Sequence, residues 1–291
     1  MKIYYFTGSG NSLDTAKRLS QSLDASLISV ASMVDEDIIN IDDNCIGIVF
    51  PVYFSLNYTG IPLIVQRFIQ RISSLKGKYI FAVITSGHTP FNTLENLSDL
   101  IESREGILSC GFIINAKEVS FKVDIKNKMN SMFNKGINIV HVDINTSLEN
   151  EYATKLPLII KTVINRELSM IKIQSNLAKV MLAPFLTIVK AIFSARYKKL
   201  AQARMSYFSD YINYADNSFI VNDNCIGCGT CQKICPVNNI TMHNNNPKWN
   251  NKCENCLACY QWCKHNAIHG EIVRYNQKYT NPNVTLQEMI N

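Results

Sequence analysis

The chain has 291 residues, of which 47% are apolar and 18% are charged, and its formal net charge is +6. This length accommodates one large domain or two smaller ones, and the apolar content is sufficient for a folded core, which excludes a wholly disordered chain. Ten cysteines are present, and eight of them fall between Cys225 and Cys263.

The sequence gives no sign of export or of membrane insertion. Residues 1–6 run into a glycine-rich turn before the apolar core of a signal peptide could form. The later apolar stretch 177–193 is interrupted by two lysines and a proline, whereas a membrane span needs about 20 nearly uninterrupted apolar residues. We therefore expect a cytoplasmic protein without a transmembrane segment. In that reducing compartment, cysteines bind metal more readily than they form disulfides.

The first half of the chain alternates between strand and helix patterns. Apolar runs predict strands at 2–6, 27–30, 45–50 and 79–85, with one or two more at about 107–123 and 137–142. Apolar residues at helical spacing predict helices at 13–23, from Pro62 to 72, and at about 91–103. This alternation implies the α/β class, with a doubly wound parallel sheet covered by helices on both faces.

Three loops that follow predicted strands carry candidate ligand-binding residues. The first is Thr7-Gly8-Ser9-Gly10-Asn11-Ser12, which stands between a strand and a helix. In such a turn, backbone N–H groups and the helix dipole favour a phosphate. The other two loops contain Pro51, Tyr53 and Phe54, and Thr85, Ser86 and Gly87. Because ligands of doubly wound sheets bind beyond the carboxyl ends of the strands, we expect the three loops to form one site.

The first loop lacks the features of two other nucleotide-binding motifs. A Walker A loop would require a Gly-Lys-Ser/Thr sequence, and a Rossmann fingerprint would require a third small residue where Leu13 stands. The loop instead matches the T-x-[TS]-G-N-[TS] pattern and resembles the phosphate loop of flavodoxins.

The resemblance to flavodoxins implies an FMN-binding domain over residues 1–146. In that domain Thr7, Ser9, Gly10, Asn11 and Ser12 would bind the phosphate, while the loop that begins at Pro51 would present Tyr53 or Phe54 to the flavin ring. Residues Thr85, Ser86 and Gly87 would line the edge of the ring. Ordinary core packing is the alternative for each aromatic residue. His88 would either bond to the flavin or cap the following helix.

A helical connecting region is predicted for residues 147–216. Its lysines and arginines outnumber its acidic residues, so this region carries most of the positive net charge of the chain. The rest of the chain is close to neutral. The simpler interpretation is a solvated basic face opposite an apolar stripe that packs on the core: Leu177, Val180, Met181, Phe185, Ile188 and Ile192. The alternative is a docking surface for an acidic redox partner or for peripheral contact with an anionic membrane. No nucleic-acid-binding motif accompanies the charge, so nucleic acid is not an expected partner.

Residues 225–240 and 253–268 form an internal repeat. With a shift of 28 positions all four cysteines coincide, and each half reads C-x2-C-x2-C-x3-C. Zinc sites favour separated C-x2-C pairs, and disulfides need an oxidising compartment, so both alternatives are disfavoured. The spacing resembles that of bacterial two-cluster ferredoxins, in which the fourth cysteine of each run ligates the other cluster.

The resemblance to ferredoxins implies a small α+β domain at 217–291 that holds two [4Fe–4S] clusters. One ligand set would be Cys225, Cys228, Cys231 and Cys263, and the other Cys253, Cys256, Cys259 and Cys235. The sequence departs from the family after Cys263, where Lys264 replaces the proline found after Cys235. Lys264 would either raise the potential of the nearby cluster or point into solvent. The remaining cysteines, Cys45 and Cys110, are expected to be buried core thiols.

Together the two resemblances indicate a flavodoxin–ferredoxin fusion. Such a chain is expected to pass low-potential electrons between two [4Fe–4S] clusters, FMN and redox partner proteins. The alternative is an FMN/iron–sulfur oxidoreductase, in which the ferredoxin domain feeds a flavin that reduces a small-molecule acceptor. A third interpretation is a regulatory module with clusters and no flavin. No catalytic residue and no oligomeric state can be assigned from the sequence.

Overall fold

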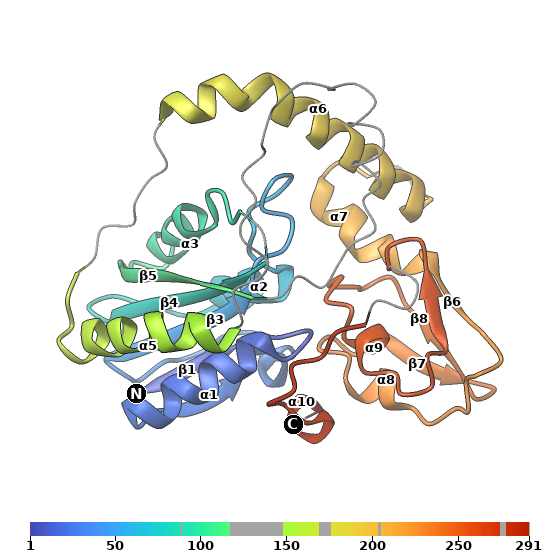
Figure 1. Ribbon diagram of the computed structural model, residues 1–291, viewed down its shortest axis with the longest axis horizontal. Coiled ribbons are helices and arrows are strands. Elements are labelled where there is room, and N and C mark those ends of the chain that lie inside the picture. Colours follow the sequence, from blue (N-terminus) through green and yellow to red (C-terminus); the bar gives the residue numbers. More distant parts are fainter. Residues whose placement is uncertain (88, 117–147, 169–175, 203–204, 274–277, 291) are drawn as a thin grey trace.

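The computed structural model of the chain describes residues 1–87, 89–116, 148–168, 176–202, 205–273 and 278–290. Five parallel strands form a sheet in the order β2-β1-β3-β4-β5 (Figure 1). The strands are β1 (Lys2–Tyr5), β2 (Ser26–Ser29), β3 (Cys45–Pro51), β4 (Tyr79–Ser86) and β5 (Leu108–Asn115). The order reverses between β1 and β3, which makes their carboxyl ends the expected ligand-binding crevice of a doubly wound sheet.

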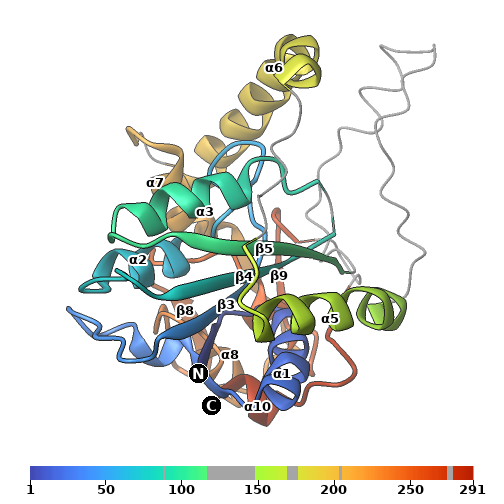
Figure 2. The ribbon, with the colours of Figure 1, turned by 90° about the vertical axis from the view of Figure 1, so that its left-hand side faces the viewer.

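Helices cover both faces of this sheet, as the sequence predicted. Helices α1 (Asn11–Leu23) and α5 (Leu148–Ile164) lie side by side on one face (Figure 2), and α2 (Leu63–Arg71) and α3 (Thr93–Glu102) pack on the other. A short 3-10 helix, η1 (Val30–Met33), follows β2. Alternate residues of β3 enter the two cores: Ile48 contacts the α2–α3 layer and Val49 the α1–α5 layer. The interior strand β4, between β3 and β5, is buried along its whole length.

The helices and strands predicted for residues 2–103 are present, with ends that differ by a few residues. For the last part of the domain, β5 ends at Asn115, and the strand predicted at 137–142 lies outside the described residues. Cys110 is fully buried as expected, whereas Cys45 is only half-buried.

The connecting region is helical, but its parts pack in different places. Helix α5 lies against β5 and α1, although the boundary predicted at 146 separates it from the sheet. Helix α6 (Asn176–Ala201) projects away from the sheet, and α7 (Phe208–Asn213) and the 3-10 helix η2 (Tyr214–Ser218) lead into the C-terminal region (Figure 1). Among the described helices, none is both long enough and apolar enough to cross a bilayer.

Part of the apolar stripe predicted on α6 does not face the core. Ile188 and Ile192 are 61% and 51% exposed, so the prediction is wrong for these two residues. The side chains of the other four members lie outside the described residues. The inward contacts described for α6 come from its later turns, where Phe193 and Tyr197 join an aromatic cluster with Phe54 and Phe208.

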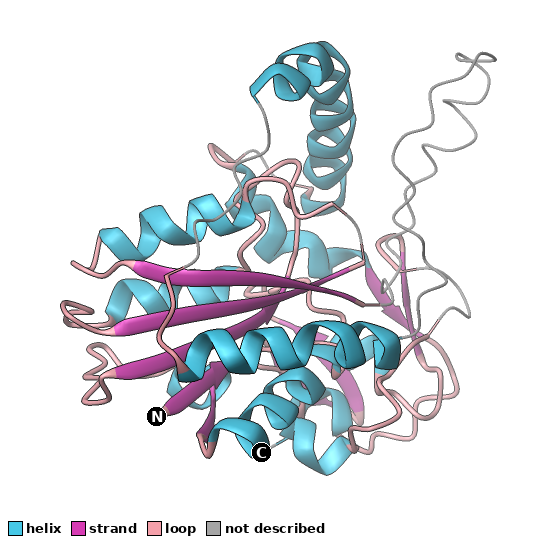
Figure 3. Cartoon of the chain, turned by 60° about the vertical axis from the view of Figure 1, so that its left-hand side comes forward, coloured by secondary structure: helices cyan, strands magenta, loops and turns pink. Residues whose placement is uncertain are grey.

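The C-terminal region shows the symmetry that the repeat predicted. Strands β6 (Phe219–Val221) and β9 (Ile268–Gly270) form one antiparallel pair, and β7 (Ile240–His243) and β8 (Asn246–Trp249) form another. Each cysteine run contains a single helical turn, α8 (Thr230–Lys233) or α9 (Ala258–Gln261). Gly229 and Leu257 precede these turns, 28 positions apart, and both are left-handed. A final helix, α10 (Leu286–Ile290), lies beside α1 (Figure 3).

The aromatic cluster of Phe54, Phe193, Tyr197 and Phe208 predicts the effect of a substitution. Phe54 is 8% exposed, so Phe54→Ala removes a ring from a packed site and should lower the free energy of unfolding by about 3–5 kcal/mol. Tyr207→Ala is the control, because Tyr207 is 72% exposed and its loss should change the free energy by no more than about 0.5 kcal/mol. Urea unfolding of anaerobically purified protein measures both, and equal losses would contradict the packing described.

Candidate cofactor sites

The eight clustered cysteines line two separate cavities, four to each. Those around the first, which we call the inner cavity, are Cys235, Cys253, Cys256 and Cys259. Those around the second, the outer cavity, are Cys225, Cys228, Cys231 and Cys263. Each cavity therefore takes three cysteines from one half of the repeat and the fourth from the other, which is the grouping that the ferredoxin resemblance implies.

Local backbone geometry explains this exchange between the halves. The third cysteine of each run lies within a single helical turn, Cys231 in α8 and Cys259 in α9. The turn carries the chain away from its own cavity, so the cysteine that follows it reaches the other one. The left-handed residue before each turn, Gly229 with φ 71° or Leu257 with φ 58°, makes the bend possible.

Both cavities offer the surroundings that iron–sulfur clusters require. Apolar side chains complete the walls, among them Ile240 and Leu257 in the inner cavity and Ile226 and Ile268 in the outer one. Backbone N–H groups point at sulfur, because the amide of Asn239 lies 3.2 Å from Cys235 Sγ and the amide of Asn255 lies 3.2 Å from Cys253 Sγ. Such N–H donors stabilise negative charge on sulfur.

The surroundings of some of these thiols oppose ionisation unless a cation is present. Burial raises the pKa of Cys231 to about 11 and that of Cys256 to about 12, because a thiolate is poorly solvated there. Since thiolates are the ligands of iron, these cysteines would ionise only with positive charge in the cavity. Within the residues that the structure describes, no three His, Cys, Asp or Glu side chains are close enough together to hold a single metal ion. The cysteine sulfurs lie instead around the walls of the two cavities.

The phosphate loop lies between β1 and α1 with its donors at the carboxyl edge of the sheet. Gly10 stands at the helix start with φ 101°, and within the described residues no side chain caps this end of α1. Thr7 Oγ1 accepts the Gly10 N–H at 3.1 Å. The hydroxyls of Ser12 and Thr85 share a hydrogen bond of 2.8 Å, which joins this loop to the end of β4. The start of α1 thus lies at the carboxyl edge of the sheet without a side-chain cap, which is the arrangement of an anion site.

The remaining residues predicted to contact the flavin are small polar residues at the strand ends and two aromatic residues. Ser9 lies within the phosphate loop, and Ser86 and Gly87 follow Thr85 at the end of β4. Tyr53 stands after Pro51 with its ring edge-on to Phe6 at 6.3 Å, close to the phosphate loop. Phe54 instead turns into the aromatic cluster, with its ring 5.2 Å from that of Tyr197, so the structure leaves Tyr53 as the aromatic residue beside the loop. His88 lies outside the described residues.

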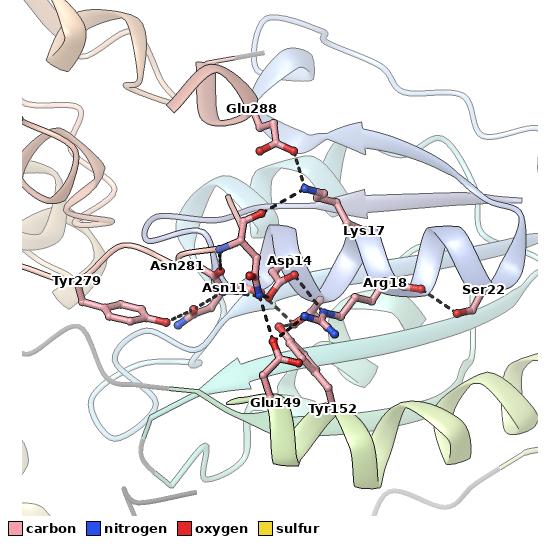
Figure 4. A network of polar contacts seen from close by, with 12 residues as sticks. Asn11, Asp14, Lys17, Arg18, Ser22, Glu149, Tyr152, Tyr279, Asn281 and Glu288 are labelled. Atoms are coloured by element: carbon pink, nitrogen blue, oxygen red, sulfur yellow. Dashed lines mark hydrogen bonds and ion pairs between the residues drawn. The ribbon is translucent and has the colours of Figure 1, made fainter. Parts of the chain in front are cut away.

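Residues 279–281, near the end of the chain, contact the phosphate loop and the first turn of α1 (Figure 4), although the sequence did not single them out. The Asn281 amide donates to the Ser9 carbonyl at 2.8 Å, and its side chain donates to Asn11 Oδ1 at 3.0 Å and to Asp14 at 3.2 Å. The Tyr279 hydroxyl also donates to Asn11, at 2.8 Å. The only sequence signal was the turn-forming Asn-Pro-Asn at 281–283, which does not reveal a partner.

The inner cavity is joined to the α/β domain by a buried carboxylate. Glu254, between Cys253 and Cys256, is 3% exposed, forms an ion pair with Arg67, and accepts the Ile64 N–H at 2.8 Å at the start of α2. Burial raises the pKa of Glu254, while the Arg67 guanidinium and the α2 amide oppose that shift. The contact fixes the inner cysteine loop against the sheet domain. Lys264, by contrast, is exposed to solvent.

Comparison with known proteins finds matches to both parts of the chain. Residues 218–264 match the family model of the 4Fe-4S dicluster domain. Solved structures similar to the N-terminal part include the Megasphaera elsdenii flavodoxin, at 15% identity over 38% of this chain and 83% of that one, with a TM-score of 0.31. A Streptococcus flavodoxin is 12% identical over 38% and 81%, with a TM-score of 0.30. No curated protein matches the chain.

The assignment of the N-terminal half therefore depends on its topology. The strand order β2-β1-β3-β4-β5, all parallel, is the flavodoxin-like variant of the doubly wound sheet. The chain joins an α/β domain of flavodoxin-like topology to a domain of the 4Fe-4S dicluster family.

Proposed function

We propose that this protein is an electron-transfer protein that passes low-potential electrons between two [4Fe–4S] clusters and FMN, and exchanges them with redox partner proteins. The observation that carries the proposal is the division of the eight cysteines into two apolar cavities of four. Four thiolates around an apolar cavity are the ligand set of a cubane cluster, and two such sets on one small domain form a relay for single electrons.

The ligands proposed for one cluster are Cys235, Cys253, Cys256 and Cys259, and those for the other are Cys225, Cys228, Cys231 and Cys263. Both sets lie among apolar side chains, and the inner set also has backbone N–H groups beside its sulfurs, which would tune the potential of a bound cluster. We also propose the domain limits 1–146, 147–216 and 217–291, with α5 packed on the sheet of the first domain.

The phosphate loop supports the proposal of FMN. The uncapped start of α1 and the hydroxyls of Thr7, Ser9 and Ser12 provide neutral donors suited to a phosphate group. Bound FMN would supply chemistry that accepts or releases one or two electrons. The chain would contribute the phosphate site, an aromatic side chain at Tyr53, and the hydroxyls of Thr85 and Ser86 at the end of β4.

Iron analysis of variants tests the two ligand sets. Anaerobically reconstituted protein should contain about eight irons and about eight sulfides per chain. The double variant Cys225→Ala/Cys228→Ala should retain about four of each, because the inner cavity keeps all its cysteines. Cys45→Ala is the control, since Cys45 lies in β3 outside both cavities and its loss should remove no iron. Redox-titrated EPR should detect two reducible clusters in the unmodified chain and one in the double variant. Fewer irons in the unmodified chain would refute the two-cluster assignment.

A charge placed in the phosphate loop tests the flavin site. Ser9→Asp adds a carboxylate where a phosphate is expected, and the affinity for FMN should fall at least tenfold, about 1.4 kcal/mol, by repulsion and loss of a hydroxyl donor. Riboflavin, which has no phosphate, should bind the variant and the unmodified chain alike. Flavin fluorescence titration measures both ligands. Equal weakening of the two, or no binding of either to the unmodified chain, would refute the site.

A further inference from the structure

The loop around the inner cavity lies directly on the phosphate loop. A methyl group at Gly8 would clash with the carbonyl oxygen of Cys256, so the two backbones are in contact. The Trp262 indole N–H donates to the Gly8 carbonyl at 3.1 Å, with both groups buried. Cys256 itself packs against the core between the sheet and helices α2 and α3. One cysteine of the inner set is thus in contact with the domain that we propose binds FMN.

Tyr53 fills the remaining space at this contact. Its hydroxyl would lie 2.7 Å from a methyl group at Gly8, and its ring packs against both the sheet core and the aromatic cluster. Burial raises the pKa of Tyr53 well above its usual value, and the neighbouring Cys256 and Glu254 add to that shift. The aromatic residue beside the phosphate loop is therefore also beside the inner cysteines.

The outer cavity has the opposite environment. Cys228 is exposed, and Ile226, in the same loop, is 65% exposed. The residues that line this cavity all come from the C-terminal domain, between Cys225 and Ile268. The outer loop therefore presents one cysteine and one apolar side chain to solvent, whereas the inner loop 254–258 is largely buried.

From this asymmetry we propose that the two clusters have fixed places in one relay: the outer cluster exchanges electrons with external carriers, and the inner cluster exchanges them with the flavin. The inference rests on the proposed function and adds the order of its centres. Electron tunnelling weakens steeply with distance, so the centre that contacts the phosphate loop is the one that can reach a flavin there.

Each passage along the relay moves one electron. In the reducing direction, a low-potential carrier would give one electron to a cluster held by Cys225, Cys228, Cys231 and Cys263. That electron would pass to a cluster held by Cys235, Cys253, Cys256 and Cys259, and from there to FMN. Two such passages, with two protons from solvent, would complete the reduction of FMN without any bond between heavy atoms forming or breaking.

EPR power saturation with a dysprosium chelate in solution tests the placement of the clusters. In the reduced holoprotein, the chelate should raise the half-saturation power of one cluster signal several-fold and leave the other unchanged. The signal that responds should be the one missing from Cys225→Ala/Cys228→Ala. An equal response of both signals, or loss of the protected signal in the variant, would overturn the order.

A pair of glycine substitutions gives a second test that keeps all ligands in place. Gly8→Ala forces the phosphate loop away from Cys256, so it should shift the potential of the chelate-protected cluster and weaken FMN binding. Gly77→Ala is the matched control: it adds the same methyl group in the loop before β4, where no atom lies within 4 Å and no cysteine or phosphate-loop residue is near, so beyond the backbone strain at its φ of 71° it should change neither. A shift of the chelate-accessible cluster in Gly8→Ala would contradict the proposal.

The two levels of the proposal fail differently. An iron content near four per chain, or no FMN binding, would refute the proposed function itself, and the order of the clusters and the flavin would then have no meaning. Full iron and flavin content, with both clusters equally accessible to the chelate, would leave the electron-transfer function standing and refute only the order of the centres.

Discussion

The grouping of four thiols around each of two cavities is the constraint on which the C-terminal domain depends. Its strands are only three or four residues long and its helices are single turns, so regular structure alone gives it little stability. Thiolates inside an apolar cavity are costly unless a cation compensates them. Because each cavity draws one cysteine from the other half of the repeat, metal bound in either cavity would hold both halves together.

A second buried charge extends this constraint into the α/β domain. Glu254 stands inside the inner cysteine loop, yet its carboxylate is satisfied by Arg67 and by the first turn of α2. A buried carboxylate without those partners would be strongly destabilising, so the inner loop is fixed in one orientation against the sheet. The same orientation places Cys256 on Gly8, which links the packing of the two domains to the proximity of their cofactor sites.

Sequence reasoning succeeded where local chemistry determines structure. The resemblance to ferredoxins implied that Cys235 groups with the second run, and the cavities group the cysteines in the same way, because a single helical turn carries the chain from one cavity to the other. The phosphate loop was predicted because glycine, hydroxyl residues and an amphipathic helix occur in the order that an anion site requires. On α6, apolar spacing was not sufficient: Ile188 and Ile192 fit a helical stripe but face solvent, since the helix projects from the body.

What the sequence could not provide were contacts between segments far apart in the chain. The neighbouring residues Tyr53 and Phe54 were equivalent candidates for contact with the flavin ring. Only the packing of Phe54 against α6 and α7 distinguishes the two. A positive φ of 55° at Phe54 turns its ring into the aromatic cluster and leaves Tyr53 facing the phosphate loop. The cover formed by Asn281 is similar, because its side chain satisfies Asn11 and Asp14 some 270 positions away. The side chains of Asn11 and Asp14, which face the C-terminal domain, are thus paired within the chain by contacts that no local sequence pattern reveals.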